Sequence, residues 1–476
     1  MARPRFILYL QTDEQRLDTL GHMNPRVRTP ALDALAADGV SCREARVVNP
    51  SCVPSRAAIM TGLYPSECGA PTFITHLEPD TETFMNRLQN AGYYTACIGK
   101  QHINRGGEVP PGYDYAAVCD MHFPHQWFFE EQLDADRLNK GAGYPRFLRD
   151  AGVTSLDELW RRYPDDERHL CLEWIGESRL HIDAFIGERA LQWIDNWAAS
   201  GTDQPAYLTV SFPGPHQPLD INHGDLLDGW QHTPAAGSPD DLKHKPPHYL
   251  AKLEENQDGR FVSPEQQYHM RQHYDANVAL IDRKIAAIIE RLKQHGLYDD
   301  TLILFSSDHG DFMGDYGLEA KGQYLSDDLL RVPMIIKPPA DAAGDCRQLE
   351  EELIESIDIT AMILGSAGCN TDHCSGVDWS RAWRDPAGDK PERAYAVAEA
   401  GGIRMITDGR FKVISYHERD YGEAYDLQAD PHELENLWDN GERRAERDAL
   451  LAKLAEHRLG RCPYIDAKWN TNAPAI

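Results

Sequence analysis

The chain is organised around one stretch, Asn49-Pro50-Ser51-Cys52-Val53-Pro54-Ser55-Arg56-Ala57-Ala58-Ile59-Met60-Thr61-Gly62. Pro50 and Pro54 lack the N–H group that a helix interior needs, and the residues after Arg56 resume an apolar helical pattern. Because Ser55 can cap the first turn, we expect a loop that becomes a helix, with Cys52 near the helix N-terminus. Free N–H groups, the helix dipole and the guanidinium favour an anion there, so the stretch predicts an electropositive pocket with a potential nucleophile. The alternative is a buried structural cysteine in a proline-rich turn.

Composition and charge limit the classes of partner. The 476 residues and a hydrophobic fraction of 41% permit one large domain plus a smaller one. A formal net charge of -28 repels polyanions, so we expect no nucleic acid and no acidic membrane surface as partner. No stretch approaches the roughly 20 apolar residues of a membrane span, and no signal-peptide apolar region precedes the first strand. We therefore expect a cytoplasmic protein whose cysteines are mostly reduced.

Charged residues follow two predicted strands. The apolar run 6–10 predicts a strand buried on both faces of a parallel sheet, and Asp13 and Glu14 follow its carboxyl end, where open α/β sheets place ligands. A second strand over 93–98 precedes Lys100 and His102, which would face the same ligand from an extended segment. The structural alternatives are a solvated acidic loop, a surface lysine and a histidine satisfied in the core.

Two later strands end in the same way. Residues 206–211 predict a strand that leads to His216, which prolines hold on a loop. Residues 301–305 predict a strand that ends at Asp308 and His309, after a long helix whose apolar seam covers 278–292. If a parallel sheet aligns the four strands, their charged residues converge on one edge.

The remaining pattern predicts the architecture. We expect helices over 30–37, 83–91, 183–198 and 357–365, and strands over 40–48 and 332–336. Beyond about residue 376 the pattern changes to a hairpin around Asp408-Gly409 and a terminal helix over 443–459. We therefore predict a catalytic α/β domain over 1–375, with a large mixed, mostly parallel sheet flanked by helices, and a smaller C-terminal α+β domain over 376–476, built on an antiparallel sheet.

The segment 103–185 has no sustained periodicity. It reads as long loops and short helices over the active-site face, where they would shape the substrate pocket. Its aromatic cluster comprises Phe123, Trp127, Phe128 and Phe129. The alternative interpretation of this segment is a contact within a homo-oligomer.

Several motifs together resemble the sulfatase family of the alkaline phosphatase superfamily. Cys-x-Pro-Ser-Arg followed by an apolar pair and Thr-Gly resembles its first signature, and Gly-Tyr-x-Thr-x-x-Ile-Gly-Lys-x-His resembles its second. Gly-Pro-His-x-Pro resembles its segment with a substrate-contacting histidine, and Ser-Asp-His-Gly resembles its second metal-binding element. Lys321 in Ala-Lys-Gly corresponds to a lysine that the family uses at the sulfate.

The resemblance implies a cofactor set and a site. In the family, a formylglycine-generating enzyme oxidises the cysteine that matches Cys52, and one hydroxyl of the hydrated aldehyde attacks sulfur. The implied ligands of a divalent cation are Asp13, Glu14, Cys52, Asp308 and His309. This set suits calcium, with manganese or zinc as alternatives. Arg56 and Lys100 would stabilise the nucleophile's oxygens, Lys321 and His216 would hold the sulfate and help to protonate the alcohol, and His102 would take the proton that expels sulfate.

These expectations predict hydrolysis of a small aryl, alkyl or carbohydrate sulfate monoester to the alcohol and inorganic sulfate. A phosphonate or phosphate ester hydrolase of the same superfamily is the alternative, and the pair of Lys100 and His102 favours sulfate. A third hypothesis, from another class, is a non-catalytic anion-binding homologue.

Overall fold

The computed structural model describes residues 3–103, 111–119, 143–155, 158–162, 171–221, 224–257, 263–385, 387–388 and 391–457. The aromatic cluster at Phe123, Trp127, Phe128 and Phe129 lies outside the described residues. Within the described ranges, no helix has both the length and the apolar character needed to cross a membrane.

A seven-stranded sheet forms the centre of the molecule, in the order β2-β10-β9-β1-β8-β4-β5. Strand β1 pairs in parallel with β8 and β9 on its two sides, β4 is parallel to β8 and β5, and β10 is antiparallel to β9 and β2. The predicted mixed, mostly parallel sheet is therefore confirmed. The strands are β1 (Phe6–Asp13), β2 (Val40–Ser41), β4 (Tyr94–Gly99), β5 (Tyr115–Val118), β8 (Ala206–Pro215), β9 (Thr301–Ser307) and β10 (Met334–Lys337).

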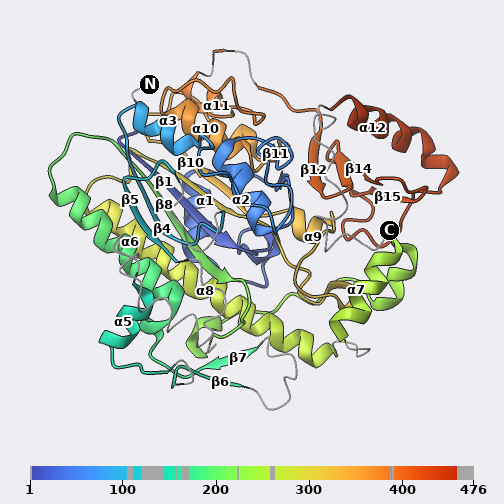
Figure 1. Ribbon diagram of the computed structural model, residues 1–476, viewed down its shortest axis with the longest axis horizontal. Coiled ribbons are helices and arrows are strands. Elements are labelled where there is room, and N and C mark those ends of the chain that lie inside the picture. The colour runs from blue at the N-terminus through green and yellow to red at the C-terminus, as the bar shows by residue number, and fades with distance from the viewer. Residues whose placement is uncertain are drawn as a thin grey trace.

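Helices cover both faces of this sheet (Figure 1). Phe6, Leu8 and Leu10 of β1 pack into the core formed with α1 (Pro30–Asp38), α6 (Ile182–Ala199) and α8 (Pro264–Gln294). Ile7 and Tyr9 point to the opposite face and pack with α2 (Cys52–Thr61), α3 (Phe84–Asn90) and α10 (Asp358–Ser366). A continuous apolar run thus forms a strand that is buried on both faces, because successive side chains alternate between the two cores.

The predicted strand over 40–48 is wrong. The chain makes only β2 in the main sheet and then β3 (Ala45–Arg46), which pairs in parallel with β11 (Ile354–Glu355) in a separate two-stranded sheet. The buried guanidinium of Arg46 binds Asp327 at 2.8 Å, so this segment leaves the apolar sheet to reach a carboxylate. A buried charge requires such a partner.

The helix after Pro50 begins earlier than its prolines predicted. Helix α2 starts at Cys52, and Pro54 lies in its first turn, where a missing N–H group breaks no helical hydrogen bond. The prediction that Ser55 caps the helix is wrong: its hydroxyl donates to the carbonyl of Asp308 at 2.6 Å. This bond ties the start of α2 to the end of β9.

The segment before α6 contains more strand than its lack of periodicity predicted. Strand β5 extends the main sheet, and β6 (Trp160–Arg162) forms an antiparallel pair with β7 (Leu172–Trp174). One short helix, α5 (Tyr144–Asp150), lies between them among the residues described here. Strands of three or four residues are too short to show a clear period.

The C-terminal part forms a four-stranded antiparallel sheet in the order β12-β13-β14-β15. The predicted hairpin around Asp408-Gly409 joins β13 and β14, and Figure 1 shows α12 lying over this sheet. Its elements are β12 (Ala396–Ala400), β13 (Ile403–Thr407), β14 (Phe411–Tyr416), β15 (Gly422–Asp426) and α12 (Arg444–Glu456). The other helices are α7 (Pro247–Gln257), α9 (Asp327–Leu330) and α11 (Arg381–Arg384).

Candidate active site

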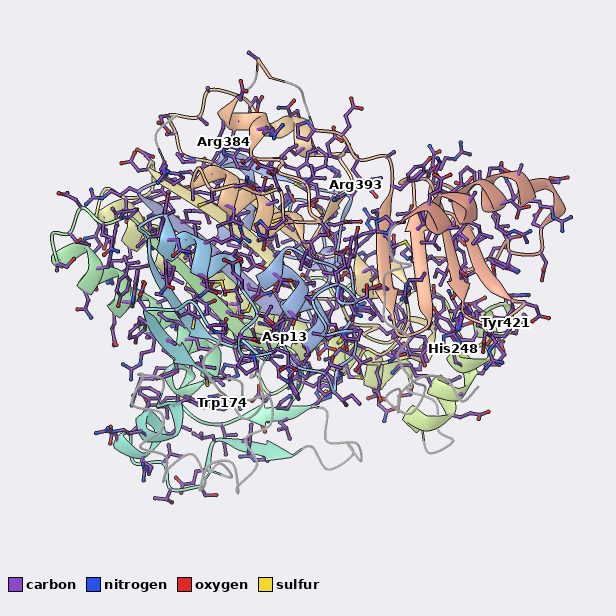
Figure 2. All side chains as sticks on the ribbon, turned by 45° about the horizontal axis from the view of Figure 1, so that its top comes forward. Asp13, Trp174, His248, Arg384, Arg393 and Tyr421 are labelled. Carbon is purple, nitrogen blue, oxygen red and sulfur yellow. The ribbon has the colours of Figure 1, made fainter. Side chains whose placement is uncertain are left out.

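Four neighbouring strands deliver charged residues to one edge of the sheet. Strands β9, β1, β8 and β4 lie side by side, and each ends in or just before a candidate residue. These residues are Asp13, Glu14, Lys100, His216, Asp308 and His309. Figure 2 marks Asp13 at this edge, between the sheet and the segment that carries Trp174. The predicted convergence is therefore present for these six residues, and His102 is not among them.

Four buried side chains bring possible metal ligands together: Asp13, Cys52, Asp308 and His309. The Cys52 sulfur lies 3.1 Å from Nε2 of His309 and 3.8 Å from Oδ1 of Asp13. The same Nε2 lies 3.9 Å from Oδ1 of Asp13 and 3.8 Å from Oδ1 of Asp308. Ligands bound at about 2.0 to 2.4 Å around one cation stand at such distances from one another. The four donors therefore fit a divalent cation.

Arg56 orients both carboxylates of this cluster. Its Nε binds Oδ2 of Asp308 at 2.6 Å, and its Nη2 binds Oδ2 of Asp13 at 3.0 Å. Its Nη1 donates to the Ser211 hydroxyl at 2.9 Å and to the Lys100 carbonyl at 3.0 Å. Although burial lowers the pKa of the guanidinium, the Asp308 and Asp13 carboxylates raise it above its usual value. Arg56 thus holds one oxygen of each carboxylate, and the other oxygen lies toward His309.

The His309 ring has a fixed orientation. Its Nδ1–H donates to the Gly310 carbonyl at 2.9 Å, so Nε2 is the nitrogen that faces Cys52. Burial lowers the pKa of His309, but Asp308 and Cys52 together outweigh burial and raise it to about 9. A divalent cation on Nε2 would displace that proton, because only the neutral ring can coordinate.

Cys52 is 1% exposed, at the first turn of α2. Burial and the Asp13 carboxylate raise the pKa of its thiol, but three nearby cations outweigh them and hold it well below its ordinary value; they are Lys100, Lys321 and His309. Positive side chains therefore surround Cys52, and the carboxylates of Asp13 and Asp308 offset part of their charge.

Glu14 lies beside the candidate sulfate-binding residues and outside the four-donor cluster. Its Oε1 binds Nζ of Lys321 at 3.1 Å, and its Oε2 lies 3.4 Å from Nε2 of His216. Burial raises the pKa of Glu14, but His216 and Lys321 outweigh burial and lower it below the usual value. Asp13, Glu14 and His216 form a second group of potential metal ligands, which shares Asp13 with the first.

Lys100 and His102 are not arranged as the sequence suggested. Nζ of Lys100, which is fully buried, binds Oδ2 of Asp13. His102 has a left-handed backbone (φ 49°), and its ring contacts Phe73 edge-on at 5.6 Å between centroids. The alternation of an extended segment, which predicted a common side for the two residues, is therefore wrong at His102.

Sequence analysis missed Asp311 as a site residue. Its carboxyl is buried, and burial together with the charge of Glu14 raises its pKa to about 8. The charge of Glu14 thus favours the protonated carboxyl of Asp311, which can donate a hydrogen bond to Glu14. Its position in Ser-Asp-His-Gly-Asp was the available signal.

Comparison with known proteins was consistent across sequence and structure. A family model described as Sulfatase matches residues 5–369, and one described as N-sulphoglucosamine sulphohydrolase, C-terminal, matches residues 314–459. The uncharacterized sulfatase YidJ of Escherichia coli K12 is 28% identical over 99% of this chain and 90% of its own length. The choline-sulfatase of Rhizobium meliloti is 27% identical over 90% of this chain and 80% of its own length.

Solved structures share the fold. The phosphonate monoester hydrolase of Agrobacterium radiobacter has a TM-score of 0.79 at 23% identity and covers 96% of both chains. A structure in complex with its substrate D-glucosamine-2-N,6-O-disulfate has a TM-score of 0.71 at 20% identity, and the match covers 96% of this chain and 97% of that one. At these identities the two structures support the fold alone.

Proposed function

The chain belongs to the sulfatase family and is a hydrolase of sulfate esters, and we propose that it cleaves a small sulfate monoester with a formylglycine made from Cys52 and a divalent cation. The observation that supports this proposal best is the buried cluster of Asp13, Cys52, Asp308 and His309 at the start of α2. The family match and this cluster point to the same activity.

Asp13, Asp308, His309 and residue 52 would hold the cation. When bound, it would supply Lewis-acid activation of the nucleophilic oxygen and offset the charge of the sulfate. We propose calcium, and the imidazole among the ligands makes manganese and zinc the alternatives. Metal analysis of the purified protein identifies the ion.

The formal charges of the site fit an anionic substrate. Arg56, Lys100 and Lys321 contribute three positive charges, and Asp13, Glu14 and Asp308 contribute three negative charges, so these six side chains sum to zero. A dication would bring the site to +2, which attracts a sulfate ester and stabilises charge in the transition state. The nucleophile needs this environment because the sulfate oxygens otherwise repel it.

Lys321 and His216 would hold the sulfate. Both now contact the Glu14 carboxylate, an anion whose place a sulfate oxygen can take. Nδ1–H of His216 donates to the Gln217 carbonyl at 2.7 Å, so Nε2 is left to carry the proton for the leaving alcohol. We keep His102 as the proposed base of the step that releases sulfate.

The test begins with maturation. Because Cys52 is 1% exposed, a formylglycine-generating enzyme must reach it before the chain folds, so the two proteins are to be co-expressed. We expect the peptide with residue 52 to lose about 18 Da, the change from thiol to aldehyde. Sulfatase activity should appear only in the modified protein, and Cys52→Ala is the control. An active enzyme with wholly unmodified Cys52 would contradict the proposal.

A phosphonate monoester hydrolase is the second candidate, because solved structures of that activity share this fold. Nitrophenyl sulfate and a phenyl phosphonate ester are the substrates to compare. We expect a higher kcat/KM for the sulfate. A preference for the phosphonate by several orders of magnitude would favour the second candidate.

A further inference from the structure

A small pocket borders His216. Its volume is about 30 Å³, which is room for roughly two water-sized groups. Residues from α6, α8, β7 and the end of β8 line it, and those that decide its chemistry are Trp160, Trp174, Asp183, His216, Asp220 and Asn277. We call it the His216 pocket. His216 therefore borders both this pocket and the proposed sulfate site.

The His216 pocket is acidic. His181 accepts the N–H of Asp183 on Nδ1 at 3.2 Å, so its proton is on Nε2, which donates to Oδ1 of Asp220 at 3.1 Å. Although burial lowers the pKa of His181, Asp220 and Asp183 raise it above its usual value, so one imidazole faces two carboxylates here. No lysine or arginine is among the described residues that line the pocket, so Asp183 and Asp220 give it negative charge.

Asn277 lines the pocket and carries a buried acceptor without a partner among the described residues. Its Nδ2 donates to Oδ2 of Asp183 at 3.1 Å, which fixes the orientation of the amide. Its Oδ1 is buried and has no hydrogen-bond partner in the described protein. Gly214 makes room for this oxygen, since a Cβ there would stand 1.9 Å from it. A buried acceptor of this kind calls for a donor from a ligand or from water.

Aromatic rings form another wall. The Trp174 ring, marked in Figure 2, meets the Trp160 ring edge-on at 6.3 Å and the His181 ring at 5.0 Å. Aromatic faces, carboxylates and a free amide oxygen together favour a cation that also donates hydrogen bonds. A primary ammonium on one methylene group has this chemistry and this size, whereas a sugar ring is too large for 30 Å³.

We infer that the His216 pocket binds the ammonium group of the substrate, so that the preferred substrates are sulfate esters of short amino alcohols. The inference rests on the proposed sulfate hydrolysis, with the sulfate on the Lys321 side of His216 and the ammonium on the other. Net charge gives a second reason: a chain of formal charge -28 repels a simple alkyl sulfate at long range but does not repel a zwitterion.

Binding to the metal-loaded protein with unmodified Cys52 tests the inference without turnover. Calorimetry compares 2-aminoethyl sulfate with n-propyl sulfate, which has the same shape and no charge on its alkyl end. We expect the ammonium compound to bind at least about tenfold more tightly. Asp220→Asn should remove that preference, because it keeps an acceptor for His181 and loses the charge. Glu188→Gln is the matched control, since Glu188 is an exposed carboxylate on α6, paired with Lys284.

The outcomes separate this inference from the proposed function. Equal binding of the two sulfates, or a preference that survives in both Asp220→Asn and Trp160→Ala, overturns the inference and leaves the pocket as a site for water only. A clear preference for the ammonium compound that is lost in Asp220→Asn supports the inference. This holds even when the formylglycine form hydrolyses neither sulfate, because that result contradicts only the proposed function. Hydrolysis of both with equal kcat/KM overturns the inference and supports the function.

Discussion

Asp308→Asn is expected to remove the cation and destabilise the protein at the same time. The carboxylate binds Arg56 at 2.6 Å and supplies one of the four cluster donors, and it is fully buried. Breaking one partner of such a buried pair costs about 3 kcal/mol of folding free energy. Wild-type protein in metal at about 1,000 times its Kd gains a further ~4 kcal/mol from binding, which the variant loses with its ligand.

Asp327→Asn is the matched control for this experiment. Asp327 is also buried and binds two cations, Arg46 at 2.8 Å and Lys412 at 2.7 Å, but it lies outside the donor cluster. Urea unfolding of the three proteins, with saturating metal and with a chelator, separates the two effects. We expect Asp327→Asn to lose about 3 kcal/mol in both conditions. For Asp308→Asn, the free energy of unfolding should be lower than that of the wild type by about 3 kcal/mol in chelator and by roughly 7 kcal/mol in metal. One bound ion per chain in Asp308→Asn, or an equal loss in both conditions, would refute the assignment of the cluster as the metal site.

Three further predictions follow from other contacts. Lys321→Gln should lower kcat/KM for a sulfate ester by about 10²-fold or more, with metal content unchanged, because it removes a charge aimed at the sulfate and no cluster donor; a matching loss of metal would contradict this role. Burial lowers the pKa of His248 to about 4 from its usual 6.5. The neutral ring therefore makes its full contribution to folding stability above pH 6.5, and that contribution is lost as the pH falls toward 4. Between pH 7 and pH 4 in chelator, the free energy of unfolding of His248→Phe should therefore fall by about 3 kcal/mol less than that of the wild type. Urea unfolding at each pH measures this difference. Parallel pH profiles of the two proteins would count against a buried neutral ring. In the wild type, the proton shared by Asp311 and Glu14 is lost above pH 8, so we expect kcat/KM to fall there. Asp311→Asn keeps a side-chain donor for Glu14 at every pH, so the kcat/KM of this variant should not fall above pH 8.

The sequence allowed the sheet edge to be predicted because each buried strand is a continuous apolar run followed at once by its charged residue. Asp13, His216 and Asp308 could be grouped on this basis before any coordinates, since parallel strands share their carboxyl ends. Short elements carried no such signal, as β3 and β5 show. The contacts of Glu14 could not be predicted either, because its backbone has a left-handed φ of 67° that no local sequence pattern indicates.

The His216 pocket could not be predicted for a different reason. Three separate segments contribute Asp183, Asp220 and Asn277. Asp183 lies in the first turn of α6, Asp220 lies on a loop, and Asn277 is a polar residue within the long helix α8, so none of them indicates a site by its own sequence context. Only the packing of α6 and α8 against the end of β8 brings them together. A site made by tertiary contacts between elements has no sequence period.

The competing function is hydrolysis of a phosphonate monoester. A sulfate monoester and a phosphonate monoester both carry one negative charge, so the net charge of the site does not distinguish these two substrates. Lys100 bears on the choice between them, since its ammonium is buried on Asp13 and so adds positive charge beside residue 52. We expect this charge to favour sulfate, so Lys100→Met should lower sulfate turnover more than phosphonate turnover on the same enzyme; an equal fall for both would remove Lys100 as a determinant of this choice.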